Sequence, residues 1–317
     1  MSKMSTDLVR HALSGPTMGT RWSARFWAKP GFDVAQIRSG LQAAVDEVDA
    51  QMSIWKTDSA LMRLNRAPVG EAVPIPAMLK QVLQLGVAIG KASGSAFDMG
   101  VGDAVSAWGF GPASASLDSI RAAMSARRMS AVEALVFGHG TVTKRTAIML
   151  DLNGIAKGFG VDRLAETLSA LGVRDALVGI DGEMRALGGR PDGQPWTVAV
   201  EKPDPDRRAP HSVLALSDCA VATSGDYRHF ISVRGRRLSH TIDPQRGAPL
   251  LEPPASVTVI APSCALADAW ATALMVLGPD DGSGLARTVG LEALFLLRDE
   301  RDTVRGRGVG NSFEHAA

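Results

Sequence analysis

The pair of residues with the clearest chemical potential is an acid and a hydroxyl, four positions apart in an apolar segment. Asp268 and Thr272 lie within residues 263–278, which we expect to form a helix, among alanine, leucine, methionine, valine and tryptophan. On a helix this spacing places both side chains on one face, one turn apart. A carboxylate in such surroundings needs a partner, because an unpaired buried charge is very costly. Two hard oxygens suit Mg²⁺, but pairing with an arginine or capping a neighbouring loop explains Asp268 equally well.

A second stretch, residues 151–166, reads DLNGIAKGFGVDRLAE and combines an acid, a lysine and three glycines. Glycines at 154, 158 and 160 allow backbone to approach a ligand without intervening side chains. The start of a helix there would offer free N–H groups and a favourable dipole to an anion. The stretch therefore predicts the phosphate end of a cofactor site, with Lys157 as an added positive charge or simply as a solvated side chain.

Two further polar stretches close strands, TSGDY at residues 223–227 and SHTIDP at residues 239–244. His240 ends a strand, where a structural role is the commoner explanation, and Asp243 before a proline is typical of a turn. Trp55 lies in a polar loop, where surface packing and ligand contact are equally good interpretations. Asp98, in AFDMGVG, has the surroundings of a loop that approaches a ligand, although a turn acid is usually a cap.

The elements that must position these residues follow from periodicity. One apolar face predicts a helix over residues 34–52, with Asp33 and Gln36 as a capping box, and another predicts a helix over 77–92. Alternation predicts a strand over 21–28, and a hairpin joins 134–137 to 147–152 through Gly138-His139-Gly140. Short strands from 175 onward, flanked by helices, indicate an α+β fold with mixed or antiparallel sheets.

Composition excludes several function classes. The chain has 317 residues, a net charge of +1 and one tyrosine, which argues against a nucleic-acid surface. Cys219 and Cys264 fit no zinc spacing and are expected to be free thiols. The sequence has no apolar run long enough for a membrane span and no signal-peptide pattern. We therefore expect a cytoplasmic protein; a removed leader would instead allow a periplasmic or membrane-anchored one.

Seven motifs together resemble the FAD:protein FMN transferase family, the ApbE-type flavin transferases. In chain order they are MGT, MSIWKTDSALMRLN, GSAFDMGVG, DLNGIAKGFGVD, VATSGDYRHF, RLSHTIDPQRGAPL and VTVIAPSCALADAWATALMVLG. The likeness covers nearly the whole chain, from Met18 to the strand around residues 294–297. Two departures stand out: Trp55 replaces the more usual tyrosine, and Asn153 replaces a smaller residue.

The resemblance implies a Mg²⁺-dependent enzyme that cleaves FAD, attaches FMN through a phosphoester to a Thr or Ser hydroxyl of an acceptor protein, and releases AMP. The implied acceptor is a flavoprotein subunit of a redox complex. A Mg²⁺-dependent FAD pyrophosphatase and a non-catalytic FAD-binding protein remain alternatives. The implied fold is two-lobed, with the cofactor in a cleft between lobes, built by one domain over residues 16–304 between a flexible 1–15 and a frayed 305–317.

The resemblance also implies roles for individual residues. Mg²⁺ would bind the side chains of Asp268 and Thr272 and the backbone carbonyl of Gly154. His240 would lie near the phosphates and assist proton transfer, with Asp268 acting in catalysis through the metal. The residues implied to contact FAD are Met18, Trp55, Ala96, Phe97, Asp98, Asp151, Lys157 and Ile242.

Overall fold

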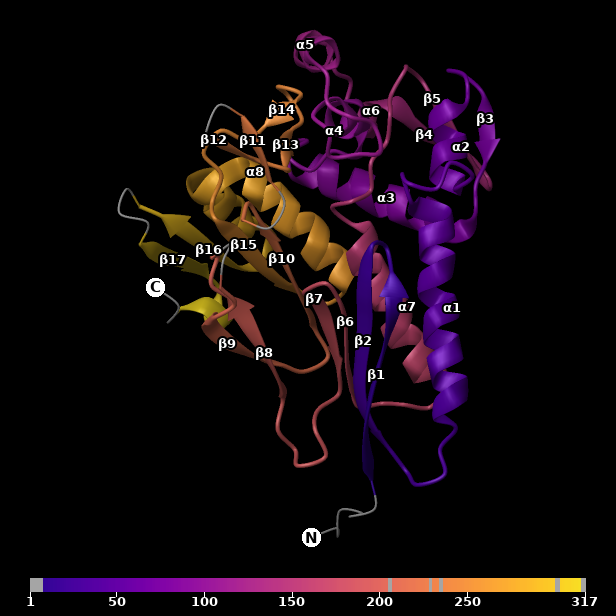
Figure 1. Ribbon diagram of the computed structural model, residues 1–317, viewed down its shortest axis with the longest axis vertical. Coiled ribbons are helices and arrows are strands. Elements are labelled where there is room, and N and C mark those ends of the chain that lie inside the picture. Colours follow the sequence, from indigo (N-terminus) through magenta and orange to yellow (C-terminus); the bar gives the residue numbers. More distant parts are fainter. Residues whose placement is uncertain (1–7, 205–206, 228–229, 234–235, 300–302, 315–317) are drawn as a thin grey trace.

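The computed structural model describes residues 8–204, 207–227, 230–233, 236–299 and 303–314 (Figure 1). Its centre is an eight-stranded sheet in the order β1-β2-β6-β7-β10-β15-β16-β17. Each neighbouring pair in this sheet is antiparallel, which confirms the expected α+β class with antiparallel sheets. The strands are β1 (Val9–Thr17), β2 (Thr20–Ala28), β6 (Ala176–Ile180), β7 (Glu183–Leu187), β10 (Ala220–Gly225), β15 (Ser256–Ala261), β16 (Glu292–Arg298) and β17 (Val304–Val309).

The two faces of the sheet bury different partners. Helices α1 (Val34–Met52), α7 (Ala156–Ala170) and α8 (Cys264–Val289) cover one face, and α1 and α7 run side by side along β1 and β2 (Figure 1). Strands β8 (Trp196–Glu201) and β9 (Pro210–Leu216) pack on the other. Along strands β6 and β16, successive side chains therefore point to opposite faces of the sheet. Ala176, Val178, Ala293 and Phe295 belong to the helix-side clusters, whereas Leu177, Leu294 and Leu296 join the β8–β9 side.

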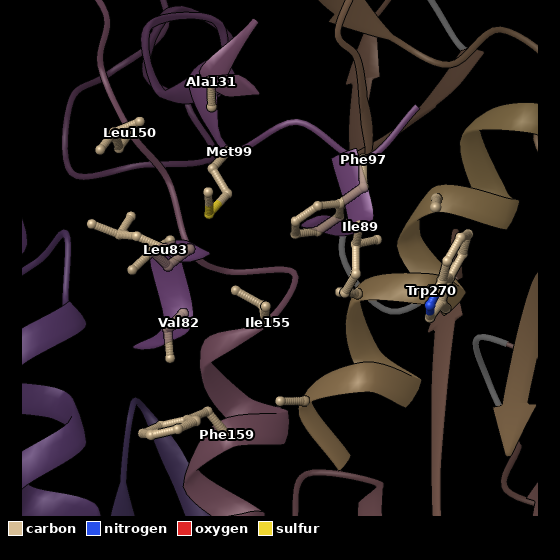
Figure 2. Packing of buried hydrophobic residues seen from close by; sticks show 14 of the residues in the cluster. Val82, Leu83, Ile89, Phe97, Met99, Ala131, Leu150, Ile155, Phe159 and Trp270 are labelled. Atoms are coloured by element: carbon tan, nitrogen blue, oxygen red, sulfur yellow. The ribbon is translucent and has the colours of Figure 1, made fainter. Parts of the chain in front are cut away.

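Residues between α1 and α7 form a helical layer with one small sheet. Its elements are α2 (Ala60–Arg66), β3 (Ala72–Pro74), α3 (Ala77–Ala92), the short 3₁₀ turn Met99–Val101, α4 (Gly102–Ala107), α5 (Leu117–Ser125), α6 (Ala131–Ala134), β4 (Leu135–Phe137) and β5 (Thr141–Lys144). Figure 2 shows how this layer meets α7 and α8: side chains of α3 and of the segment at 97–99 converge with Ile155, Phe159 and Trp270. The core that supports the site is therefore shared between distant segments of the chain.

The helices at 34–52 and 77–92 are confirmed. Asp33 caps α1 by accepting a hydrogen bond from the Gln36 amide at 2.9 Å. The helix expected over residues 263–278 is also confirmed, but it continues as α8 to Val289 after an interruption at Gly278 (φ 74°), which Pro279 follows.

The remaining strands are β11 (Phe230–Val233), β12 (Arg236–Ser239), β13 (Ile242–Asp243) and β14 (Ala248–Pro249).

The expected hairpin of 134–137 with 147–152 is wrong in its second strand. The turn at 138–140 exists, but β4 pairs with β5, residues 141–144. Residues 147–152 belong to no strand, yet Leu150 and Leu152 are buried in the main core. Their apolar character reflects burial of an irregular segment rather than sheet pairing, and the composition of a short run does not distinguish the two.

Both predicted flexible ends are wrong where the structure describes them. Within 1–15, described from residue 8, β1 pairs along its length with β2. Within 305–317, described to residue 314, β17 pairs with β16, and Phe313 is only 1% exposed. Backbone pairing at the edge of the sheet orders a polar sequence, VRGRGV, that has no hydrophobic alternation of its own. No helix in the described residues is both long and apolar enough to cross a membrane.

Candidate active site

One cavity of about 1220 Å³ lies against α7, α8, β10 and the β6–β7 turn. Its walls are formed by segments that lie far apart in the sequence, from Met18 to Val276. Every residue predicted to bind cofactor or metal, or to act in catalysis, lines it: Met18, Trp55, Ala96, Phe97, Asp98, Asp151, Gly154, Lys157, His240, Ile242, Asp268 and Thr272. The structure establishes their proximity to one cavity, and their individual roles remain predictions.

Asp268 and Thr272 lie one turn apart on α8, as their spacing predicts. Asp268 is 5% exposed, and its Oδ2 accepts a hydrogen bond from the Gly158 amide at 2.9 Å. Thr272 Oγ1 lies 3.2 Å from Ser224 Oγ on β10. The Asp268 partner found among the described residues is thus a backbone amide in the first turn of α7, and pairing with an arginine is wrong.

The glycines of the 151–166 stretch serve helix packing and access to Thr272. A Cβ at Gly158 would lie 2.4 Å from the Cys264 carbonyl oxygen and 2.8 Å from Asp268 Cβ. A Cβ at Gly154 would lie 3.0 Å from Thr272 Oγ1. At Gly158 the amide expected to face an anionic ligand instead donates to a carboxylate of the protein itself. The phosphate-binding role of the stretch stays a prediction.

The oxygen donors at this point of the cavity fit Mg²⁺. Asp268 offers a carboxylate, Thr272 a hydroxyl, and Gly154 a backbone beside that hydroxyl. These are the hard ligands that Mg²⁺ prefers, and it commonly uses one or two carboxylates, completed by water and phosphate oxygens. Within the described ranges no group of three or more His, Cys, Asp or Glu side chains is arranged to hold a metal.

Charges around Asp268 are strongly coupled. Burial and the nearby Glu183 together raise the pKa of Asp268 to about 7, although Lys157 acts in the opposite direction. Lys157 Nζ lies 2.7 Å from Glu183 Oε1 and 3.8 Å from Asp181 Oδ2. Burial by itself lowers the pKa of Lys157, but Glu183, Asp268 and Asp181 outweigh it, so that pKa is raised. The lysine is therefore a permanent cation, and Asp268 is poised to lose a proton near neutral pH.

Two other acids on the cavity wall shape loops. Asp98 Oδ1 accepts hydrogen bonds from the amides of Gly100 (2.7 Å) and Ala131 (3.0 Å). Asp151 accepts from the amide of Asn153 at 2.8 Å and from its side chain at 3.0 Å. Burial raises the pKa of Asp151 to about 6. The cap interpretation of Asp98 is thus confirmed, while both residues still face the cavity.

The aromatic residues differ in exposure. Trp55 is 64% exposed and lines the cavity wall, which is compatible with both surface packing and ligand contact. Phe97 is 4% exposed and belongs to the core as well as the lining (Figure 2). Met18, in the β1–β2 turn, adopts a left-handed backbone (φ 44°). Trp55 is therefore free to cover a ligand, whereas Phe97 forms a fixed floor.

His240 follows β12 and reaches the cavity beside Ile242. Its ring meets Phe110 edge-on, with ring centroids 6.3 Å apart. Asp243 Oδ1 accepts hydrogen bonds from the amides of Gln245 and Arg246, which confirms it as a turn former. His240 thus lies on the cavity wall with an aromatic neighbour that limits the orientation of its ring.

Sequence reasoning missed Glu183, which is buried and pairs with Lys157. The preceding Asp181-Gly182 closes a strand and marks a turn, but a glutamate at the start of a strand gives no further signal. Ser224 lies within the polar stretch at 223–227, whose sequence indicates no role for it, and its hydroxyl contacts that of Thr272. Both contacts depend on the pairing of sheet and helix, which local sequence does not specify.

Fold and site together define the class: an α+β protein with an antiparallel sheet and a nucleotide-sized cavity, in which a helix presents a carboxylate and a hydroxyl beside a partly buried lysine. The chain matches the ApbE family over residues 18–295 and belongs to this family.

Relatives are similar over most of their length. The FAD:protein FMN transferase of Vibrio cholerae is 36% identical, with 91% of this chain and 87% of the relative covered. That of Escherichia coli K12 is 33% identical over 92% and 85%. The structure of the flavin transferase ApbE from Vibrio cholerae has a TM-score of 0.85 at 33% identity and covers 97% and 99% of the two chains. The apo form of Pseudomonas stutzeri flavinyl transferase ApbE has a TM-score of 0.85 at 34% identity over 98% and 97%.

Proposed function

We propose that this protein is a Mg²⁺-dependent FAD:protein FMN transferase, which attaches FMN to a Thr or Ser of an acceptor protein and releases AMP. Family membership and the names of its relatives support the activity. The observation that carries it to this chain is the convergence on one cavity of every residue that the family resemblance assigns to FAD, metal or catalysis.

FAD is proposed to occupy this cavity as the substrate, in the cleft of a two-lobed fold. Trp55, the exposed ring, stacks on an aromatic part of the nucleotide, a contact typically worth about 1–3 kcal/mol. Ala96, Phe97, Met18 and Ile242 provide the apolar surface. Lys157, a permanent cation, faces the phosphates. The caps on Asp98 and Asp151 hold their loops in place against the nucleotide.

Asp268, Thr272 and the carbonyl of Gly154 are the proposed Mg²⁺ ligands. When bound, Mg²⁺ neutralises pyrophosphate charge and stabilises the departing phosphate. The protein's own contribution is to hold these oxygens rigidly. The Gly158 amide fixes Asp268, and Ser224 fixes the Thr272 hydroxyl. Such fixed placement is the main requirement of phosphoryl transfer.

The transfer itself exchanges a phosphoanhydride bond for a phosphoester bond. The acceptor hydroxyl oxygen forms a bond to the phosphorus on the FMN side, the bridging P–O bond of the pyrophosphate breaks, and AMP leaves with the bridging oxygen. The hydroxyl proton passes to a base. His240 is the proposed base, because Asp268 is a poor one when it binds a metal, and the edge contact with Phe110 restrains its ring.

The test is to incubate the protein with FAD, MgCl₂ and candidate flavoprotein subunits of redox complexes. Flavin fluorescence that stays with the acceptor in a denaturing gel, together with an added FMN mass and equimolar AMP, is the expected result. Free FMN and AMP without labelling would indicate a pyrophosphatase, and FAD binding without AMP release would indicate a binding protein. Either result with a full set of acceptors contradicts the proposal. A cytoplasmic location remains a separate prediction.

A further inference from the structure

The β6–β7 turn presents two carboxylates to one lysine of α7. Lys157 Nζ lies 2.7 Å from Glu183 Oε1 but 3.8 Å from Asp181 Oδ2. The Glu183 side chain is 5% exposed, whereas that of Asp181 is 38% exposed. An exposed pair at the longer distance contributes little, because water screens it. Glu183 is therefore the partner that determines where the lysine lies.

The backbone of the turn fixes Glu183 in this place. Ile180 pairs with Glu183 across a two-residue turn, in which Asp181 (φ 51°) and Gly182 (φ 114°) both have positive φ. Opposite it, a Cβ at Gly179 would lie 2.8 Å from the Glu183 carbonyl oxygen. Such close pairing leaves the glutamate little freedom to move with its partner.

The pair is costly to separate. Among the described residues, Glu183 Oε2 is buried without a hydrogen-bond partner, so Lys157 is the group that compensates this carboxylate. Removing the lysine would leave the buried Glu183 carboxylate unpaired, and an unpaired buried charge is strongly destabilising. Lys157 thus remains on Glu183 even with another carboxylate nearby.

That other carboxylate is Asp268. The amide that binds Asp268 Oδ2 belongs to Gly158, the residue next to Lys157. Lys157 and Asp268 attract each other electrostatically, and a lysine on Asp268 would occupy the carboxylate that a divalent cation needs. Competition of this kind lowers cation affinity by the free energy of the competing ion pair.

We propose that Glu183 is a positioning residue that keeps Lys157 away from Asp268 and so leaves the Asp268 carboxylate available to a divalent cation. The inference rests on the proposed function through the assignment of Asp268 as a metal ligand. Under this proposal Glu183 supports metal binding without being a metal ligand.

The test measures Mg²⁺ binding by calorimetry at pH 8, without FAD. Glu183→Gln should weaken Mg²⁺ binding by about tenfold, because the released lysine pairs with Asp268; couplings of this size are usual for neighbouring charges. In a Lys157→Met background, the same substitution should change the affinity by less than about threefold. The double variant also retains no unpaired buried charge, so it stays measurable if Glu183→Gln alone folds poorly.

Asp181→Asn is the matched control, because it removes the same charge from the same lysine at the weaker contact. Its Mg²⁺ affinity should stay within about threefold of the unmodified protein. An equal loss in Asp181→Asn and Glu183→Gln, or a loss that persists in the Lys157→Met background, indicates general electrostatics and overturns the inference. If the unmodified protein binds FAD but no Mg²⁺, the metal assignment fails and this inference fails with it. If it binds Mg²⁺ but labels no acceptor, the transferase proposal alone fails.

Discussion

Single residues at this site carry properties that are unusual for their type. Asp268 is buried with a pKa raised to about 7 by burial and by Glu183, and Trp55 is an aromatic ring left 64% exposed. In each case the placement of the group at the cavity is unfavourable for the protein without a ligand, because a charge is buried or an apolar ring is exposed to water. Substitutions that remove only that property should therefore separate ligand binding from folding.

Asp268→Asn should stabilise the metal-free protein at pH 8, by about 1–3 kcal/mol, because a buried negative charge is removed while an amide oxygen can still accept from Gly158. The increase in melting temperature caused by MgCl₂ should disappear. Thermal unfolding with and without MgCl₂ measures both effects. Asp118→Asn, at a carboxylate that is 96% exposed, is the control and should change neither. A lower melting temperature for Asp268→Asn without metal would contradict the assigned burial penalty.

Trp55→Ala should weaken FAD binding by about tenfold, because the stacking surface is lost. Trp55→Tyr keeps a ring and should bind FAD within about threefold of the unmodified protein. Neither substitution should alter the free energy of unfolding by more than about 0.5 kcal/mol, since the ring is mostly exposed. Fluorescence titration with FAD and denaturant unfolding provide the two measurements. Equal FAD affinity of the alanine variant would place the nucleotide elsewhere in the cavity.

At the scale of elements, the site depends on how closely α7 meets α8. Gly158 is in contact with the Cys264 carbonyl, and Asp162, one turn further along α7, accepts the amides of Cys264 (2.8 Å) and Ala265 (2.9 Å) at the start of α8. Arg185 of β7 holds the same carboxylate at 2.6 Å. These polar contacts fix the first turns of α8, and therefore the position of Asp268, relative to α7.

Gly158→Ala should force the two helices apart, because the new Cβ would lie 2.4 Å from a carbonyl oxygen. Overpacking of this kind costs about 1–3 kcal/mol, and the loss of the amide contact to Asp268 should also weaken Mg²⁺ binding. Gly160→Ala on the same helix is the control, since its Cβ would meet only the ends of the flexible Ile180 and Met18 side chains at 3.0 and 3.1 Å. Chemical denaturation and calorimetry should show the larger loss at position 158. Equal effects at both positions would contradict the close-packing argument.

An element could be predicted from the sequence when local interactions stabilise it, and could not when it depends on pairing with a distant strand. Helix α1 shows its apolar face and its Asp33 cap in the sequence, and Asp268 with Thr272 shows the helical spacing. Strand β17 and the pairing of β4 with β5 depend on backbone bonds to partners chosen by the whole sheet. Glu183 is similar, because its role arises only when β7 lies beside α7. Local pattern thus predicts elements, and the sheet decides their partners.

The whole molecule has a net charge of only +1. It nevertheless contains several buried or partly buried acids whose pKa values are raised. Burial raises the pKa of Asp268 to about 7, that of Asp151 to about 6, and those of Asp98, Asp162 and Glu183 in the same direction. Most sit on the cavity wall. Their joint titration should therefore connect metal binding to the stability of the entire fold.

The final prediction concerns the pH dependence of that stability. Between about pH 4 and 7 the folded state binds more protons than the unfolded chain, because Asp151 and Asp268 titrate above the ordinary value of 3.8. The free energy of unfolding of the metal-free protein should thus fall as pH rises through this window. His211, with a pKa lowered by burial, opposes this trend below 6.5 as one partly exposed group.

Mg²⁺ should counteract this loss where Asp268 is ionised. Its stabilising effect, seen as the shift in melting temperature, should be larger at pH 8 than at pH 6, because at pH 6 the cation must displace a proton from the carboxylate. Melting curves from pH 5.5 to 8 with and without MgCl₂ test both trends, and Asp268→Asn should flatten the metal-free curve. A metal-free melting temperature that rises steadily to pH 8, or an Mg²⁺ shift that grows toward pH 6, would show that Asp268 does not link metal binding to folding.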